Sequence, residues 1–327
     1  MNSILQLLQL DPDNYEAHPL HRLERDWTET NCWQDMMIEL LHVLGLDPIA
    51  PAAFTLSTDF EGNQWTLFKY PPEDLRTLYG MEIAELYVWR PVIDHLEMSL
   101  EQGKLLTVEV DSFYLPDTAG VTYQIDHTKT GIVPQMLDRA GRRLQYFHNA
   151  GYFELSGADF DGIFLMNGKP DPHVLLPYVE VVHLERLRRP DAEELRKLAV
   201  GLTKEHLARR PFTNPMPRFK EHLEQDLQWI TDHGEAGFHP YAFATCRQCG
   251  ASAELAAAFI DWLNGHDKAG LEKAADCYRE ISSTAKGLQF ALARVARGRK
   301  IDFDGPFERM TASWADATDQ LVSHYMN

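Results

Sequence analysis

The chain has 327 residues, of which 44% are hydrophobic and 24% charged, and its formal net charge is −18. This length and composition are typical of a globular protein with room for two domains, and the negative charge disfavours nucleic acid as a partner, because phosphate contacts need a basic face. The sequence has no membrane-length apolar run, no basic N-terminal leader with a cleavage site and only four scattered cysteines, so we expect a cytoplasmic protein without a disulfide framework.

The acidic residues are concentrated in the first half of the chain. Residues 1–180 contain 11 Lys and Arg against 28 Asp and Glu, whereas residues 181–327 contain 20 against 21. A solvated acidic surface is one explanation of this asymmetry. The other is a site that attracts an amine or another cation.

The first helix is predicted within NCWQDMMIELLHVLG, residues 31–45. Its apolar residues recur every three or four positions, Asn31 and Gln34 have the spacing of an N-cap and its N3 partner, and Gly45 marks the end. Cys32 is therefore expected at the first helical position, where the helix dipole and free backbone N–H groups favour thiolate and lower the pKa of a thiol. The alternative is a cysteine that serves only packing.

The remainder of the first half predicts helices and an antiparallel sheet. Strand-like content flanks an acidic, Gly-containing turn within FTLSTDFEGNQWTLFKY (54–70). Helices are expected within PPEDLRTLYG (71–80) and RPVIDHLEMSLEQGK (90–104). A central strand is expected within LLTVEVDSFYL (105–115), with a returning partner strand in RLQYFHNAGYFEL (143–155).

From about residue 177 the pattern becomes helical. After a transition in VEVVHLERLRRP (179–190), strong helix formers, Pro at starts and Gly at ends predict about five helices with short connections. We predict two domains, residues 1–176 and residues 177–327. The fold class is α+β: a papain-like N-terminal half, with a Cys-bearing helix on an antiparallel sheet, followed by an all-helical region.

A thiolate nucleophile needs a base and a third group that orients the base. His127 opens a strand after a loop, and the order of Cys on an early helix, His on a strand and Asn on the next strand is that of papain-like folds. The predicted catalytic residues are Cys32, His127 and Asn149. The alternative candidates are Asp111 and Glu154 for the orienting group and His148 for the base. Predicted substrate-binding residues are Asp59, Glu61, Gln64, Trp65, Asp111 and Lys129.

Two other features bear on this prediction. Papain-like enzymes usually place an amide donor for the oxyanion about six residues before the cysteine, and Asp26 occupies that position here. Gln34 or the backbone N–H of Cys32 is the substitute. The spacing of Cys246 and Cys249 suits a zinc or redox site. A zinc site needs four ligands, however, and His239 is the one nearby residue that could join these two cysteines, so we expect them to serve in packing. No metal site is predicted.

Several long segments together resemble an uncharacterised bacterial domain-of-unknown-function family that is often encoded beside amino acid:carrier protein ligases and their small carrier proteins. The segments are NCWQDMMIELLHVLGLDP, DFEGNQWTLFKY, EVDSFYLPDTAG, HTKTG and YFHNAGYFEL. That family is more distantly similar to the N-terminal part of butirosin-type acyltransferases, which move an aminoacyl group from a carrier-protein thioester to an amine, and to papain-like peptidases.

The resemblance implies a cysteine acyltransferase that moves an aminoacyl group from a carrier-protein thioester to an amine-bearing small molecule. The implied partners are an aminoacyl carrier protein, whose phosphopantetheine supplies the thioester, and an amino acid:carrier protein ligase; the chain needs no cofactor of its own. A papain-like cysteine hydrolase and a non-catalytic partner of the ligase and carrier are the alternatives. Basic residues of the second half are the expected docking sites for an acidic carrier: Arg186, Arg188, Arg189, Arg209 and Arg210, or Arg294, Arg297, Arg299 and Lys300.

Overall fold

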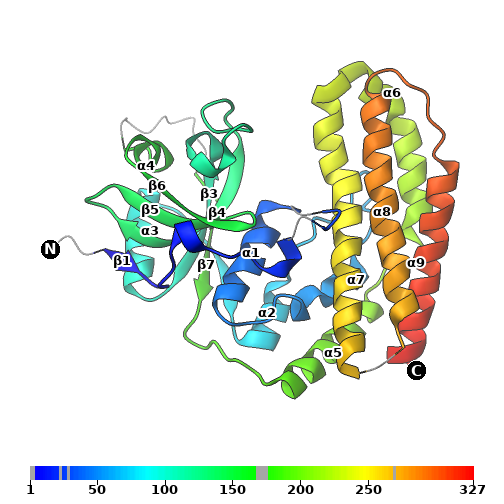
Figure 1. The fold of residues 1–327 in the computed structure, drawn as a ribbon, viewed down its shortest axis with the longest axis horizontal. Coiled ribbons are helices and arrows are strands. Elements are labelled where there is room, and N and C mark those ends of the chain that lie inside the picture. Colours follow the sequence, from blue (N-terminus) through cyan, green and yellow to red (C-terminus); the bar gives the residue numbers. More distant parts are fainter. Residues whose placement is uncertain (1–3, 22–23, 28–29, 167–175, 268–269) are drawn as a thin grey trace. The chain divides into compact units, whose positions relative to one another are not determined.

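The computed structural model describes residues 4–21, 24–27, 30–166, 176–267 and 270–327 (Figure 1). The chain forms two compact units. The first unit consists of residues 1–22, 31–46 and 75–189, and the second of residues 23–30, 47–74 and 190–327. The predicted α+β class is confirmed, with an antiparallel sheet in the N-terminal half and a helical C-terminal region.

The first unit is built on an antiparallel sheet with the strand order β2-β7-β3-β4-β5-β6, and β1 pairs with β4. The strands are β1 (Leu5–Gln6), β2 (Glu82–Leu86), β3 (Leu105–Asp111), β4 (Lys129–Asp138), β5 (Arg143–His148), β6 (Gly151–Ser156) and β7 (Val179–His183). The central strands β3 and β4 are largely buried, because apolar side chains cover both of their faces.

Two segments of this sheet differ from the sequence prediction. The single return strand expected over residues 143–155 is a hairpin of β5 and β6, because Asn149 adopts a left-handed conformation (φ 45°) in the turn between them. The expected transition at residues 179–190 begins with β7, which pairs with β2 on one side and β3 on the other. The predicted domain boundary after residue 176 thus precedes the last strand, and the second unit resumes at Pro190.

Four α-helices accompany the sheet in the described part of the N-terminal half: α1 (Cys32–Val43), α2 (Pro72–Tyr79), α3 (Val92–Glu101) and α4 (Ala158–Ile163). The predicted start of α1 is correct, since the Asn31 side chain accepts a hydrogen bond from the Gln34 backbone N–H at 2.9 Å. Gly45 follows the end of the helix with a φ of 69°.

Helix α1 is buried on more than its apolar stripe. Asp35 and Glu39 are only 1% and 0% exposed. The N-terminal segment covers them: His21 Nε2 lies 3.3 Å from Asp35 Oδ1, and both the His21 Nδ1 and the Tyr15 hydroxyl contact Glu39. These partners satisfy charges whose burial is otherwise costly.

The second unit contains the C-terminal helices, and their number within its described residues agrees with the prediction. They are α5 (Ala192–Ala208), α6 (Pro215–Ala242), α7 (Gln248–Asp267), α8 (Glu272–Val295) and α9 (Asp304–Tyr325). Helix α6 continues beyond Gly234, where a helix end was expected, and is kinked at this residue, whose φ is 58° and ψ −137°. No helix among the described residues is both long and apolar enough to cross a membrane.

Residues 47–74 also belong to the second unit, and the strands expected over residues 54–70 do not form. Instead the chain makes a 3-10 helix, Ala50–Ser57, followed by a loop closed by one bridge between Phe60 and Trp65. Tertiary packing overrides β propensity here, because both Phe60 and Trp65 pack their rings against Phe219.

Buried polar contacts attach this segment to the helices of the second unit. The His206 Nε2 lies 2.7 Å from Asp74 Oδ2, and the His206 Nδ1 lies 2.8 Å from the Ser57 Oγ. Both His206 and Asp74 are almost fully buried. The Trp27 indole N–H donates to the Ser282 Oγ at 3.1 Å, which attaches Trp27 to the same unit.

The buried His21 is expected to make the stability of the first unit depend on pH. Burial alone lowers the pKa of His21, but its hydrogen bonds to Asp35 and Glu39 outweigh burial and raise the pKa to about 9. The protonated His21 therefore contributes its full stabilisation when the pH is below about 6.5, the pKa of histidine in the unfolded chain. This stabilisation is lost as the pH rises through about 9, the pKa in the folded protein. Urea denaturation of the first unit should show a loss of about 3 kcal/mol between pH 6.5 and 9.5. An unfolding free energy of the first unit that stays constant over this range would contradict the assignment, and His21→Gln should remove the pH dependence.

Gly80 and Gly103 provide a matched pair of substitutions. Both have positive φ, 66° and 72°, so alanine costs about 1 kcal/mol of backbone strain at either position. At Gly80 the new Cβ would also lie 2.2 Å from the Arg186 backbone oxygen, whereas at Gly103 no atom lies within 4 Å. Gly80→Ala should therefore destabilise the protein by clearly more than Gly103→Ala in chemical denaturation. Equal losses of unfolding free energy would disprove the close approach of the Arg186 carbonyl.

Candidate functional site

Cys32 is the first residue of α1 and is half-buried. Its backbone N–H has no acceptor among the described residues, as expected at the first turn of a helix. The Sγ lies 3.8 Å from the position that a Cβ on Gly131 of β4 would occupy. The thiol therefore faces the sheet at a point where β4 has no side chain.

The strand register identifies the other residues on this face. Successive residues of a strand point to opposite faces, and Gly131 points toward α1. Glu109 lies directly opposite Gly131, and Asp111 lies opposite Lys129. These positions, two residues apart on each strand, therefore share the face that Cys32 covers.

A buried carboxylate extends this face to β7. Glu180 is 4% exposed and lies opposite Thr107 of β3. It accepts hydrogen bonds from the Trp33 indole N–H at 2.7 Å, from Thr107 at 3.0 Å and from the Tyr178 hydroxyl at 3.0 Å. Burial and the neighbouring Glu180 raise the pKa of Tyr178 to about 12, so its hydroxyl remains a donor.

The predicted base, His127, lies immediately before β4. Its Nδ1 is 2.6 Å from Asp111 Oδ2, and its ring stacks on Phe113 with 4.3 Å between centroids. The ring is 66% exposed. Asp111 is thus the group that orients His127, whereas Asn149, the first choice from the sequence, lies in the β5–β6 turn and makes no hydrogen bond to His127 in the described structure.

Cys32 and His127 are not in contact. In the part of the chain that the structure describes, the Cys32 Sγ makes no hydrogen bond to a histidine. His127 precedes Gly131 by four residues, which corresponds to roughly 13 Å along an extended strand. A ligand or water occupying the space between them is required for any chemistry that uses both.

The alternative base, His148, faces the opposite side of the sheet. Its Nε2 lies 2.9 Å from the Oγ1 of Thr130, the neighbour of Gly131, and its Nδ1 lies 2.5 Å from Asp117. His148 is 2% exposed. Both ring nitrogens are engaged and the ring is buried, so this second His–Asp pair is structural.

The predicted substrate-binding residues divide between the two units. Asp111 and Lys129 lie in the first unit beside His127, and the Lys129 Nζ pairs with Glu109 at 2.7 Å. The others belong to the second unit: Asp59, Glu61, Gln64 and Trp65. There Asp59 pairs with Arg218 at 2.6 Å, and Trp65 is 5% exposed within the aromatic core.

The remaining described cysteines have other environments. Cys246 and Cys249 are buried in the second unit, where burial raises the pKa of Cys246 to about 12 and that of Cys249 well above its ordinary value. Cys277 is half-buried, and burial raises its pKa as well. These thiols are therefore protonated and poorly nucleophilic at neutral pH.

Sequence reasoning missed Thr107, Glu109, Glu180 and Gly131. The alternation in LLTVEVD contained a signal for the first two, because Thr107, Glu109 and Asp111 recur with the period of a strand. Glu180 was missed because its strand was not predicted. Gly131 was missed because a glycine inside a strand can mark a close approach of another element, but the sequence does not show which element packs against it.

Gly131 is expected to control access to Cys32. An alanine Cβ there would lie 3.6 Å from the Met36 Cε and 3.8 Å from the Cys32 Sγ, which is ordinary van der Waals contact. In a Cys277→Ala background, Gly131→Ala should leave alkylation of Cys32 by iodoacetamide nearly unchanged, whereas the larger Gly131→Val should slow it about tenfold. Equal alkylation rates for wild type and Gly131→Val would show that the thiol is reached from another side.

Comparison with known proteins identifies the family. No similar protein was found among curated proteins. The model of the DUF1839 N-terminal domain matches residues 16–184, and the model of the DUF1839 C-terminal domain matches residues 192–323. The two matches meet near the point where the second unit resumes at Pro190. The chain therefore belongs to the DUF1839 family.

Proposed function

We propose that the protein is a cysteine acyltransferase that moves an aminoacyl group from a carrier-protein thioester to an amine-bearing small molecule. One observation carries the proposal: Cys32, at the N-terminus of α1, faces the same side of the sheet as the His127–Asp111 pair. A thiol at a helix N-terminus and a carboxylate-oriented imidazole on the same face of a sheet are the groups that covalent acyl transfer uses.

In the first step the Cys32 sulfur attacks the thioester carbonyl. A bond forms between sulfur and the acyl carbon, the carrier's phosphopantetheine thiol leaves, and the proton of Cys32 passes to that leaving sulfur. Exchange between two thioesters is nearly neutral in energy, so the enzyme mainly orients the reactants. The free backbone N–H of Cys32 is the donor we assign to the developing oxyanion, because Asp26 replaces the usual amide donor.

In the second step the acceptor amine attacks the acyl-Cys32. His127, oriented by Asp111, takes the amine proton, and the Cys32 sulfur leaves and receives a proton in return. This proton transfer requires the amine nitrogen to lie about 3 Å from the His127 ring, or one water away, while it reaches the acyl carbon. Acceptor binding must therefore bring His127 closer to the acyl-Cys32. The histidine serves an acceptor held between the two residues and not the resting thiol.

The acidic face favours amine-bearing ligands. Glu109 and Asp111 of β3 and the buried Glu180 of β7 share the side of the sheet that Cys32 faces. Lys129, on the same side, pairs with Glu109 at 2.7 Å and offsets one of these three charges. The remaining negative potential attracts the ammonium group of an aminoacyl thioester or of the acceptor. The resemblance of the sequence to carrier-associated proteins and to butirosin-type acyltransferases supports the same substrate class.

Incubation with an aminoacylated carrier protein, followed by intact-mass analysis, tests the proposal. The wild type should gain the mass of the aminoacyl group and Cys32→Ala should not, because the nucleophile is absent. Cys277→Ala, which removes a half-buried cysteine of the second unit, should keep the adduct. His127→Ala should still form the adduct but discharge it to an added amine about 10² to 10⁴ times more slowly.

Two outcomes would redirect the assignment. Rapid loss of the adduct without any amine would identify a hydrolase. Absence of an adduct, combined with carrier binding that Cys32→Ala leaves intact, would overturn catalysis in favour of a non-catalytic partner of the ligase and carrier. The lack of contact between Cys32 and His127 is the observation that favours this second function.

A further inference from the structure

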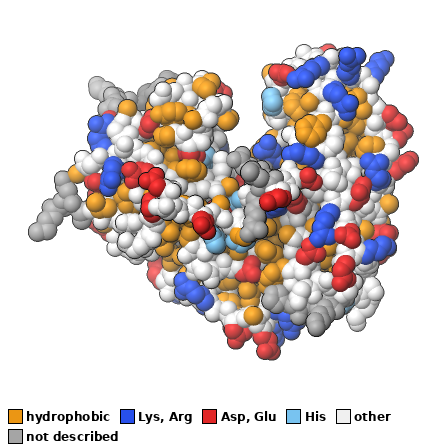
Figure 2. Space-filling model, viewed as in Figure 1, with side chains coloured by type: hydrophobic (Ala, Val, Ile, Leu, Met, Phe, Trp, Pro, Cys, Tyr) orange, Lys and Arg blue, Asp and Glu red, His pale blue; other side chains and the backbone are white. Residues whose placement is uncertain are grey.

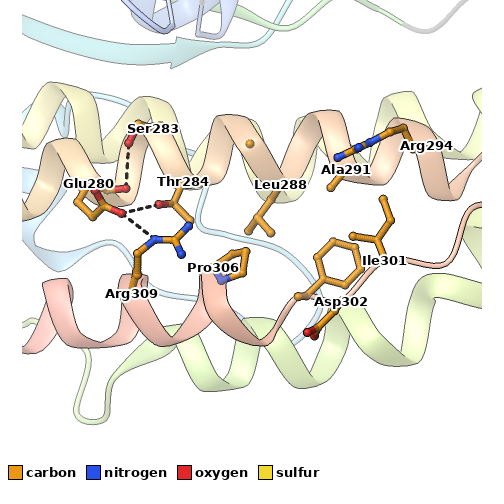
Figure 3. Close-up of a pocket in the computed structure, with 12 residues that line it drawn as sticks. Glu280, Ser283, Thr284, Leu288, Ala291, Arg294, Ile301, Asp302, Pro306 and Arg309 are labelled. Atoms are coloured by element: carbon orange, nitrogen blue, oxygen red, sulfur yellow. Dashed lines mark hydrogen bonds and ion pairs between the residues drawn. The ribbon is translucent and has the colours of Figure 1, made fainter.

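A pocket of about 380 Å³ lies between α8, α9 and the connection that joins them in the second unit (Figure 3). Its size is at the small end of the range for small-molecule sites. Its lining comes from the face of α8 between Glu280 and Arg294, from residues 301–303 and from the first turns of α9. The middle of the pocket is apolar, and polar side chains occupy its two ends (Figure 3).

Gly287 keeps the α8 wall of this pocket open. A Cβ at this position would have no atom within 4 Å, so the surrounding structure does not require a glycine. Glycine inside a helix is less favourable than alanine. The missing side chain leaves room that no part of the described chain fills.

The two polar ends of the pocket differ in their pairing. At one end Arg309 pairs with the Glu280 Oε1 at 3.0 Å, and that oxygen also accepts a hydrogen bond from Thr284 at 3.1 Å. At the other end Arg294 lines the pocket, and its guanidinium has no hydrogen-bond or ion-pair partner among the described residues. The pocket thus offers one uncompensated cation next to an apolar surface.

The surroundings of Arg294 strengthen this positive potential. Arg297, Arg299 and Lys300 follow it and are exposed, and Arg297 pairs with Glu235 at 3.0 Å. Lys and Arg side chains gather where α8 ends (Figure 2).

Two acidic residues, Asp302 and Glu235, lie near this end of the pocket against the four cations. The Asp302 Oδ1 accepts a hydrogen bond from the Asp304 backbone N–H at 3.0 Å, at the start of α9. The net potential at this end favours an anion.

We propose that this pocket binds a small organic anion, with its acidic group on Arg294 and its apolar body over Leu288 and Ile301. The pocket lies within the second unit and contains none of the residues assigned to the chemical steps of acyl transfer, so this inference goes beyond the proposed function. Arg294 also belongs to one of the two basic groups expected to dock the carrier protein. A carboxylate and a phosphate or sulfonate head present the same chemistry to a guanidinium. The apolar body distinguishes this ligand from a free inorganic ion.

Binding of 8-anilinonaphthalene-1-sulfonate, followed by its fluorescence, tests the proposal on the full chain. We expect saturable binding to one site and displacement by octanoate but not by equal concentrations of inorganic phosphate. Arg294→Gln should weaken binding about tenfold or more, because the charged hydrogen bond is lost. Gly287→Leu should abolish binding by filling the pocket while leaving the melting temperature unchanged or raised.

Matched controls separate the site from general effects. Lys197→Gln removes an exposed cation of α5, and Gly201→Leu makes the same glycine substitution on the exposed side of α5; neither should alter binding. Unchanged binding in Arg294→Gln or in Gly287→Leu would overturn the proposal, as would displacement by phosphate alone. A loss of binding in Gly201→Leu equal to that in Gly287→Leu would also overturn it, because the dye would then be reporting on the helices in general.

Discussion

The first unit depends on the neutralisation of two carboxylates inside it. Helix α1 lies on β4 and β5 with its apolar stripe, but Asp35 and Glu39 on its other side are buried as well. A buried, unpaired carboxylate would cost several kcal/mol. His21 and Tyr15, on the N-terminal segment, supply the partners. The position of α1, and with it the position of Cys32 over β4, therefore rests on contacts made by residues that precede the helix.

With α1 in place, the alternation of the strands determines the chemistry of the face beneath it. One residue of β4, Gly131, faces the thiol, and its neighbour Thr130 faces the other side of the sheet with His148. The same alternation assigns two His–Asp pairs to opposite faces. Of these two, the pair of His127 and Asp111 shares the side of Cys32. Strand register, and not residue type, therefore distinguishes the histidine of the candidate site from the buried His148.

Each compact unit is assembled from segments that are distant in the sequence. In the second unit, Asp74 and His206 meet across 132 residues and Trp27 and Ser282 across 255. Closing such long loops costs entropy that grows slowly with length, and buried hydrogen bonds and ring packing offset it. The segment around Trp65 is an example. Its sequence pattern predicts a hairpin, but its aromatic side chains pack in the core of the helical unit.

The sequence by itself determined the start and end of α1, the placement of Cys32 at its first position, the helices of the second half and the α+β class. These features follow from caps, glycines and periodicity that act within a few residues. Tertiary structure alone decided that Asp111 and not Asn149 orients His127, and that Trp65 belongs to a core. It also decided that β7 pairs inside the sheet, between β2 and β3. A shift of one residue in strand pairing moves every side chain to the opposite face, and no local pattern determines such a register.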